Sequence, residues 1–348
     1  MVRVDGWPSH PRSCGRAVTS PTEELVAART KSKIHPKYKT CYRVTNWPAY
    51  DAALRKRGDI TVWFDDDAIA SWRGRPQHKR GAPRRYSDLA ITTALTLRLV
   101  FHLPLRQAEG FVRSLLAVMD LDLEAPDHTT LSRRNKTVDV PMLSRRLDDP
   151  MHLVIDSTGL KMLGDGEWHA HKHATSNKRR TWRKLHLGVD GEGFIVASAL
   201  TERTRDDGPV AVELIDDLDR PVERFTGDGA YDTQPVYAAL TRAGTADIEI
   251  IVPPRRTASA TRSPNGVHPQ RAAAIARIGE VGRRQWRKEV GADQQARAEN
   301  AVFRYKRTFG DRLRSKGMEA QRRERTIGVN ILNKMALLGK PISEAIAA

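Results

Sequence analysis

The chain has 348 residues and a formal net charge of +17, from 59 Lys and Arg against 42 Asp and Glu, which indicates a polyanionic partner. Its hydrophobic content of 39% is low, yet a chain of this length can bury a core for one catalytic domain with flanking modules. No apolar run approaches the ~18 residues of a membrane-spanning helix, and Cys14 and Cys41 are too few for a disulfide framework, so a reducing cytoplasm and no membrane partner are expected.

The N-terminal part of the sequence is expected to be a tail followed by helices. Residues 1–36 are rich in Pro, Ser, Thr and Gly and lack periodicity, which is typical of a disordered tail. The acidic run Asp65–Asp67 fits the first turn of a helix, where the helix dipole favours acids, better than it fits a metal site. Ser87 can cap a helix that Pro104 ends, and a second helix follows with apolar residues between Phe111 and Met119.

A third helical piece begins near Asp127, which is a candidate cap together with Thr129. The pattern is a helix, a short break and a second helix that begins with Thr, Ser and Arg residues. It is consistent with a helix-turn-helix that reads DNA, with Arg133 and Arg134 as contacts. The same pattern is consistent with a small helical bundle that packs on the following domain. Residues 37–146 are therefore predicted to be an N-terminal helical, DNA-binding region, with the bundle as the alternative.

From residue 150 the pattern changes from helices to strands. Strands are predicted at 151–155, 184–189, 194–200, 223–226 and 247–252, with a turn at Asp190–Gly193 between the second and third. Helices are predicted at 208–218, 233–243, 285–307 and 326–338, and a long connection at 253–284. Asp206, Asp207 and Asp232 precede two of these helices and are interpreted as caps.

The order β-β-β-α-β-α-β-α is that of the ribonuclease-H-like fold, an α/β architecture with a mixed five-stranded sheet. We therefore predict a catalytic domain at 150–310 and a C-terminal helical extension at 311–348. In this topology the first and fourth strands are neighbours, so Asp156 and Asp228 are expected side by side at the carboxyl ends of their strands. The helix at 285–307 can bring Glu299 to the same end. Three hard oxygen ligands suit a pair of Mg²⁺ ions in phosphoryl transfer.

Three basic stretches, at 73–85, 168–189 and 255–325, flank the acidic residues. One such run is usually only a solvated surface, but three of them favour DNA as the phosphodiester partner. Candidate phosphate contacts outside the helical region are Lys161, Lys178, Arg179, Arg180 and Arg297. His169, His171 and His173 would share one face of a strand and could bind a transition metal. Contact with phosphates or a splayed base is favoured over that, because no fourth ligand is evident.

Three segments carry a resemblance to a known family: Val154–Lys161 (VIDSTGLK), Gly227–Asp232 (GDGAYD), and Glu299 with Lys306. Together they resemble the DDE transposases of bacterial insertion sequences, nearest the branch named for insertion sequence five. The resemblance covers roughly residues 40–340. One departure is that the Tyr and Arg found before the glutamate in related enzymes fall on Ala292 and Gln295, although Arg297 is nearby as a substitute.

The resemblance implies that Asp156, Asp228 and Glu299 hold two Mg²⁺ ions, for which Mn²⁺ can substitute. It implies that water cleaves the transposon end and that the freed 3′-OH then attacks target DNA. Lys306, two turns beyond Glu299 and about 10 Å along the helix, would hold a DNA phosphate. The implied partner is double-stranded DNA, as terminal inverted repeats and target, with a homodimer in the synaptic complex and no small-molecule substrate. The implied location is the cytoplasm, in association with the nucleoid when DNA is bound.

Two other functions are compatible with the same residues. A metal-dependent nuclease of this fold would cut DNA without joining it, and fold alone does not exclude that. A catalytically inactive relic would bind DNA only, but the presence of all three acidic residues disfavours decay. Mg²⁺-dependent transposition is the favoured hypothesis because the three motifs occur in the required order.

Overall fold

The computed structural model describes residues 41–74, 84–145, 147–162, 182–259 and 267–346. The tail expected at 1–36 lies outside these residues. The chain divides into one unit of residues 1–47 and 341–348 and a second unit of residues 48–340. In the first unit, β1 (Cys41–Val44) pairs antiparallel with β8 (Ser343–Ile346). The acidic residues singled out in the sequence all belong to the second unit.

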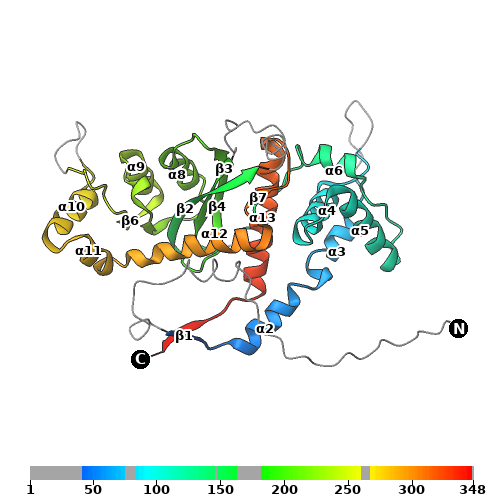
Figure 1. The fold of residues 1–348 in the computed structure, drawn as a ribbon, viewed down its shortest axis with the longest axis horizontal. Coiled ribbons are helices and arrows are strands. Elements are labelled where there is room, and N and C mark those ends of the chain that lie inside the picture. Colours follow the sequence, from blue (N-terminus) through cyan, green and yellow to red (C-terminus); the bar gives the residue numbers. More distant parts are fainter. Residues whose placement is uncertain (1–40, 75–83, 146, 163–181, 260–266, 347–348) are drawn as a thin grey trace, which may run out of the picture. The chain divides into compact units, whose positions relative to one another are not determined.

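A mixed sheet forms the centre of the second unit (Figure 1). Its strands are β2 (Met151–Met162), β3 (Trp182–Val189), β4 (Ile195–Glu202), β5 (Val222–Thr226), β6 (Gly244–Ile251) and β7 (Arg312–Leu313). The strand order is β4-β3-β2-β5-β6, and β7 pairs with the far end of β2. The first three strands are antiparallel, whereas β5 and β6 run parallel to β2. The predicted ribonuclease-H-like topology is therefore confirmed, with β7 as an addition.

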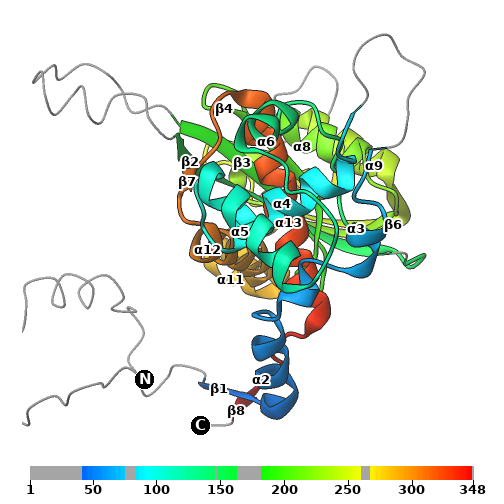
Figure 2. The ribbon, with the colours of Figure 1, turned by 90° about the vertical axis from the view of Figure 1, so that its right-hand side faces the viewer.

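Alternate residues of β2 enter two different cores, as the geometry of a strand requires. The helices that cover the sheet are α8 (Asp207–Asp216), α9 (Gln234–Ala243), α12 (Ala296–Phe309) and α13 (Met318–Leu338). Leu153 and Ile155 are fully buried against α8 and α9. Val154 joins the core that contains α12 and α13, on the other face (Figures 1 and 2). By the same alternation, Asp156 lies on the face that α12 covers.

The N-terminal helices share this second core with the sheet. They are η2 (Ile60–Val62), α3 (Asp66–Ala70), α4 (Asp88–Val100), α5 (Leu105–Val118) and α6 (His128–Arg134), whereas α2 (Trp47–Lys56), which precedes them, adds no residue to that core. The caps expected at Ser87 and Asp127 are confirmed, since Ser87 accepts from Ala90 N and Asp127 from Thr129 N and Thr130 N. These helices pack with α13 and the sheet in one core.

The polar run Asp65–Asp67 also lies where the sequence indicated. Asp65 is the N-cap of α3, and its side chain accepts a hydrogen bond from Ala68 N at 3.1 Å.

Within the described part of the chain, no single helix is long and apolar enough to cross a membrane. Only α4 and α5 taken together, with a bend of 111° between them, meet that test of length and composition.

Two predictions for the segment before Glu299 are wrong. The connection expected at 253–284 contains α10 (Pro269–Val281), which the alanine-rich run and Pro269 in the first turn favour. The single helix expected at 285–307 is broken into α11 (Arg283–Glu289), the 3₁₀ turn η4 (Ala292–Gln295) and α12. The break occurs at Gly291, which has a φ of 63° in the left-handed region that glycine adopts readily.

Candidate active site

The register of the sheet brings Asp156 and Asp228 to the same level. β2 pairs in parallel with β5, and the last pair of this ladder joins Val154 to Thr226. Each aspartate lies two residues beyond that pair, so both occupy the edge where the ladder ends. The prediction that Asp156 ends its strand is wrong, because β2 continues to Met162. Beyond Asp156 the strand is still paired with β3, on the side away from β5. Asp156 is thus a strand residue that pairs with β3 on one side and has no partner in β5 on the other.

The carboxyl group of Asp156 lies in an environment that disfavours its charge. Burial raises its pKa to about 6, the backbone N–H of Ser157 opposes that by donating to it at 2.8 Å, and three further carboxylates add to the rise. Those carboxylates belong to Asp228, Glu299 and Asp207. The three acidic residues singled out in the sequence therefore act electrostatically on one another, and a fourth joins them.

Asp228 and Glu299 are held at the more exposed side of this cluster. Asp228 caps the 3₁₀ turn η3 (Gly229–Tyr231) and accepts a hydrogen bond from Ala230 N at 2.8 Å. Glu299 lies in the first turn of α12, and both carboxylates are exposed. Gln295, just before α12, donates a hydrogen bond of 3.1 Å to the carbonyl of Ile155. The start of α12 is therefore tied to the residue that precedes Asp156.

The acidic residues suit a divalent cation by their chemistry, but their side chains are not arranged as a metal centre. Among the described residues, no three His, Cys, Asp or Glu side chains stand close enough together to form a metal centre as they lie. Carboxylate oxygens are the ligands that Mg²⁺ prefers. Burial and, after it, the neighbouring carboxylates raise the pKa of Asp156, and a bound cation would stabilise the charged carboxylate against both effects. Asp156, Asp228 and Glu299 thus fit a divalent cation by donor type and charge.

The candidate phosphate contacts nearest the acidic residues all have partners within the chain. Lys306 Nζ donates to Thr158 Oγ1 at 2.6 Å, two residues beyond Asp156. Lys161 Nζ pairs with Asp311 Oδ2 at 2.7 Å, and both side chains are about half exposed. Arg297 donates to the carbonyl of Gly191 in the β3–β4 turn. Lys306 is therefore next to the acidic site, whereas Arg297 fastens α12 to that turn.

Arg133 and Arg134 have different environments despite being adjacent. Arg134 is 15% exposed, donates to the carbonyl of Tyr86 at 3.2 Å and pairs with Asp88, so it fastens α6 to α4. Arg133 is exposed and lines a cleft of about 570 Å³ beside the start of α5. The other polar groups of this cleft come from Arg106, His128, Thr129 and Ser132. Arg133, but not Arg134, is available to a ligand.

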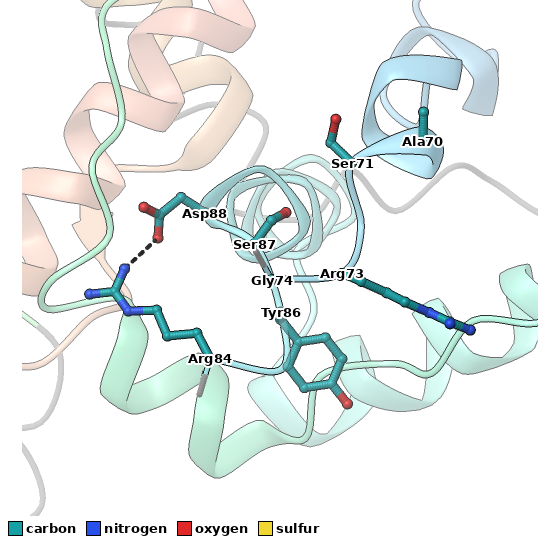
Figure 3. A pocket seen from close by; sticks show the side chains of 8 residues that line it. All are labelled: Ala70, Ser71, Arg73, Gly74, Arg84, Tyr86, Ser87 and Asp88. Carbon is teal, nitrogen blue, oxygen red and sulfur yellow. Dashed lines mark ion pairs between the residues drawn. The ribbon is translucent and has the colours of Figure 1, made fainter. Parts of the chain in front are cut away.

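A second hollow, of about 340 Å³, lies by α4 and belongs to no acidic cluster (Figure 3). Arg84 and Asp88 form an ion pair in its wall, with 3.6 Å between Nη1 and Oδ1. The segment 75–83, which joins Gly74 to Arg84, lies outside the described residues. The same holds for the candidate contacts Lys178, Arg179 and Arg180 and for the three alternating residues His169, His171 and His173.

The cap interpretations of three aspartates need correction. Asp206 does occupy the N-cap position of α8, but its side chain makes no capping hydrogen bond. Asp207 accepts instead from Lys184 Nζ at 3.1 Å. Asp232 precedes Thr233, the N-cap of α9, and its fully buried carboxylate pairs with Arg271 at 2.6 Å. The side chains of Asp207 and Asp232 thus bind cations from β3 and α10, and local sequence does not reveal these partners.

Asp207 is the residue of the acidic cluster that the sequence did not single out as a functional candidate. The signal available was two successive acids before a predicted helix, which favours a cap. Only the packing of α8 against β3 and η3 brings Asp207 to the cluster.

The sequence matches two family profiles that have the same description, transposase DDE domain. One match covers residues 148–333, more than half of the chain, and includes Asp156, Asp228 and Glu299. The other covers residues 55–165, which contain the N-terminal helices from α3 to α6 and all of β2.

Proposed function

We propose a function on the premise that this chain belongs to the DDE transposase family, as the match over more than half of its length establishes. The family processes DNA, so DNA is the partner it implies. Our proposal is that the chain is an insertion-sequence transposase. In this role it cleaves DNA at the transposon ends and transfers the freed 3′-OH strands into target DNA.

One observation supports this proposal above the others. Burial and the charges of Asp228, Glu299 and Asp207 raise the pKa of Asp156 to about 6, within a chain whose net charge is +17. A concentrated negative site in a strongly basic protein is what a polyanionic substrate and a bridging divalent cation together require.

The chain's own residues would divide the work as follows. Asp156, Asp228 and Glu299 would hold two Mg²⁺ ions, or Mn²⁺ in their place. When bound, the ions would activate the attacking oxygen and stabilise the leaving oxygen of the phosphodiester. Lys306, which now donates to Thr158, would turn to a DNA phosphate and orient the backbone across the acidic residues.

The N-terminal helices would supply further contact with the double-stranded DNA of the terminal inverted repeats. Arg133 on the exposed face of α6 supports this, because its cleft contains Arg106, His128 and hydroxyl groups. Since two transposon ends must be held together before joining, we propose that the active form is a homodimer. Its place of action would be the cytoplasm, on nucleoid DNA.

The experiment that tests the proposal compares wild type with Asp228→Asn on DNA that carries the element's own ends, with Mg²⁺ present. Wild type should cut and join, and Asp228→Asn should bind the DNA but do neither. Asp216→Asn makes the same chemical change at the far end of α8, where Asp216 pairs with Arg242, and should act as wild type. Cutting without joining would favour a nuclease. Binding without chemistry by every variant would identify a DNA-binding relic.

A further inference from the structure

Asp207 occupies a site built from two elements of the fold, α8 and β3. It is the first residue of α8, and its side chain is 20% exposed. Lys184 Nζ, from β3, donates to its Oδ1 at 3.1 Å, and His186 Nδ1, also from β3, stands 3.8 Å from the same atom. Because Asp206 and not Asp207 holds the N-cap position, this arrangement is not a helix cap.

Two buried polar atoms near Asp207 lack a hydrogen-bond partner within the described part of the chain. His186 is 1% exposed, and its Nε2 is bonded to Thr201 Oγ1 at 2.9 Å while its Nδ1 is unsatisfied. The Tyr231 hydroxyl is also unsatisfied, in a side chain that is 1% exposed. Ser157 lies near enough to lower the pKa of Tyr231 slightly, but no well-formed hydrogen bond joins the two. Buried groups of this kind normally find partners.

Tyr231 connects Asp207 to the other acidic residues. Burial and then the carboxylates of Asp207, Asp228 and Asp156 raise the pKa of its phenol. Gly227 lets the Tyr231 ring pack closely against the backbone before Asp228, because a Cβ on residue 227 would come within 2.8 Å of that ring. Tyr231 belongs to η3, the turn that Asp228 caps and against which α8, the helix of Asp207, packs.

Asp207 has a cation of fixed charge close to it. Lys184 is its one close ion-pair partner of fixed positive charge among the described residues. His186 adds none near neutral pH, because burial lowers its pKa to about 4. Asp207 thus has a fixed positive charge beside it, from Lys184, while it adds a fourth carboxylate to those of Asp156, Asp228 and Glu299.

We propose that Asp207 is a fourth acidic residue of the active site, which Lys184 and His186 hold in position and which strengthens the binding of divalent cations by Asp156 and Asp228. Asp207 acts as a positioning and charge-supplying residue from the α8 face of the sheet, opposite the face covered by α12. This inference rests on the proposed function, since it assumes the cation site.

The opposing explanation is that Asp207 and Lys184 form only a structural ion pair that joins α8 to β3. The two explanations differ in the sign of one effect. If the pair is structural, loss of either partner disturbs the site in the same way. If Asp207 supplies charge to the site, loss of Asp207 weakens cation binding, whereas loss of Lys184 leaves more uncompensated negative charge and strengthens it.

The test measures Mn²⁺ binding to the full-length protein without DNA, from the electron paramagnetic resonance signal of free Mn²⁺. Asp207→Asn keeps the shape of the side chain and should weaken binding about tenfold, as the loss of outer groups around metal sites commonly does. Lys184→Met should tighten it. Asp206→Asn removes the same charge one residue earlier, from an exposed side chain, and should bind as wild type. Thermal melting checks that each variant is folded.

Each outcome decides the inference. Asp207→Asn binding as wild type does, or Lys184→Met weakening binding as much as Asp207→Asn, would overturn it. If Asp207→Asn does not fold, Lys184→Met decides alone: tighter binding supports the inference and unchanged or weaker binding overturns it. Asp228→Asn separates this result from the proposed function. If wild type binds no Mn²⁺, or Asp228→Asn binds it equally well, the proposed cation site itself fails and the inference fails with it.

Discussion

The side-chain amide of Gln295 donates a hydrogen bond of 3.1 Å to the backbone carbonyl of Ile155. Ile155 precedes Asp156, and Gln295 lies four residues before Glu299. The bond therefore links the two parts of the chain that carry the first and the last acidic residue of the site. The family resemblance leads us to expect an arginine at position 295, whereas this chain joins α12 to β2 through a neutral side chain.

Replacing Gln295 by Ala should loosen this link. The loss of one partly buried hydrogen bond should lower the free energy of unfolding by about 1 kcal/mol. Because the acidic residues must be held closely to act together, DNA cleavage should fall more, by about tenfold. Urea unfolding and a cleavage assay measure the two effects. Gln294→Ala is the matched control, since within the described residues no hydrogen bond to its side chain is found; equal activity of both variants would contradict the prediction.

The raised pKa of Asp156 predicts how stability depends on pH without metal. The folded state holds this proton more tightly than the unfolded chain between the ordinary value of 3.8 and about 6. The Asp156 contribution therefore makes stability fall as pH rises through that window and adds no further change above it. Asp156→Asn lacks this cost. The free energy of unfolding of Asp156→Asn should equal that of wild type near pH 4. Above pH 6 it should exceed the wild-type value by about 1–2 kcal/mol, after allowance for the partial exposure of Asp156.

Urea unfolding from pH 4 to pH 8 in the presence of a chelator measures this difference. Replacing the chelator by Mg²⁺ should shrink the advantage of the variant above pH 6, because the cation offsets the repulsion among the carboxylates. Parallel stability curves for wild type and Asp156→Asn across the whole range would refute the assigned cause.

Arg133 and Arg134 should separate DNA binding from stability. Arg133→Ala removes an exposed guanidinium and should weaken DNA binding, with the slope of log affinity against log salt reduced by about 1. Its melting temperature should stay at the wild-type value. Arg134→Ala removes the bonds to Tyr86 and Asp88, so it should cost about 1–3 kcal/mol of stability. Salt-dependent binding and urea unfolding test the pair, and a stability loss in Arg133→Ala would count against the assignment.

Hydrophobic periodicity and turn residues were enough to predict the sheet. The strands around Asp156 and Asp228 have continuous apolar runs, and the Asp190–Gly193 turn has the side chain of Asp190 accepting from Glu192 N and Phe194 N. Caps such as Ser87 and Asp127 are also local, because the donor lies within three residues. The broken helix before Glu299 was missed because Gly291 is tolerated within a helical pattern, and only the positive φ shows that the helix ends there.

The sequence by itself determined the order of the strands and the identity of Asp156, Asp228 and Glu299 as candidates, because these follow from periodicity and from motifs a few residues long. Tertiary structure decided which charged groups meet. Asp207 and Asp232 both resemble caps in the sequence, yet one joins the acidic cluster beside Lys184 and the other is buried against Arg271. Their partners lie 23 and 39 residues away along the chain. Electrostatic effects depend on distance in space and on burial, and local sequence fixes neither.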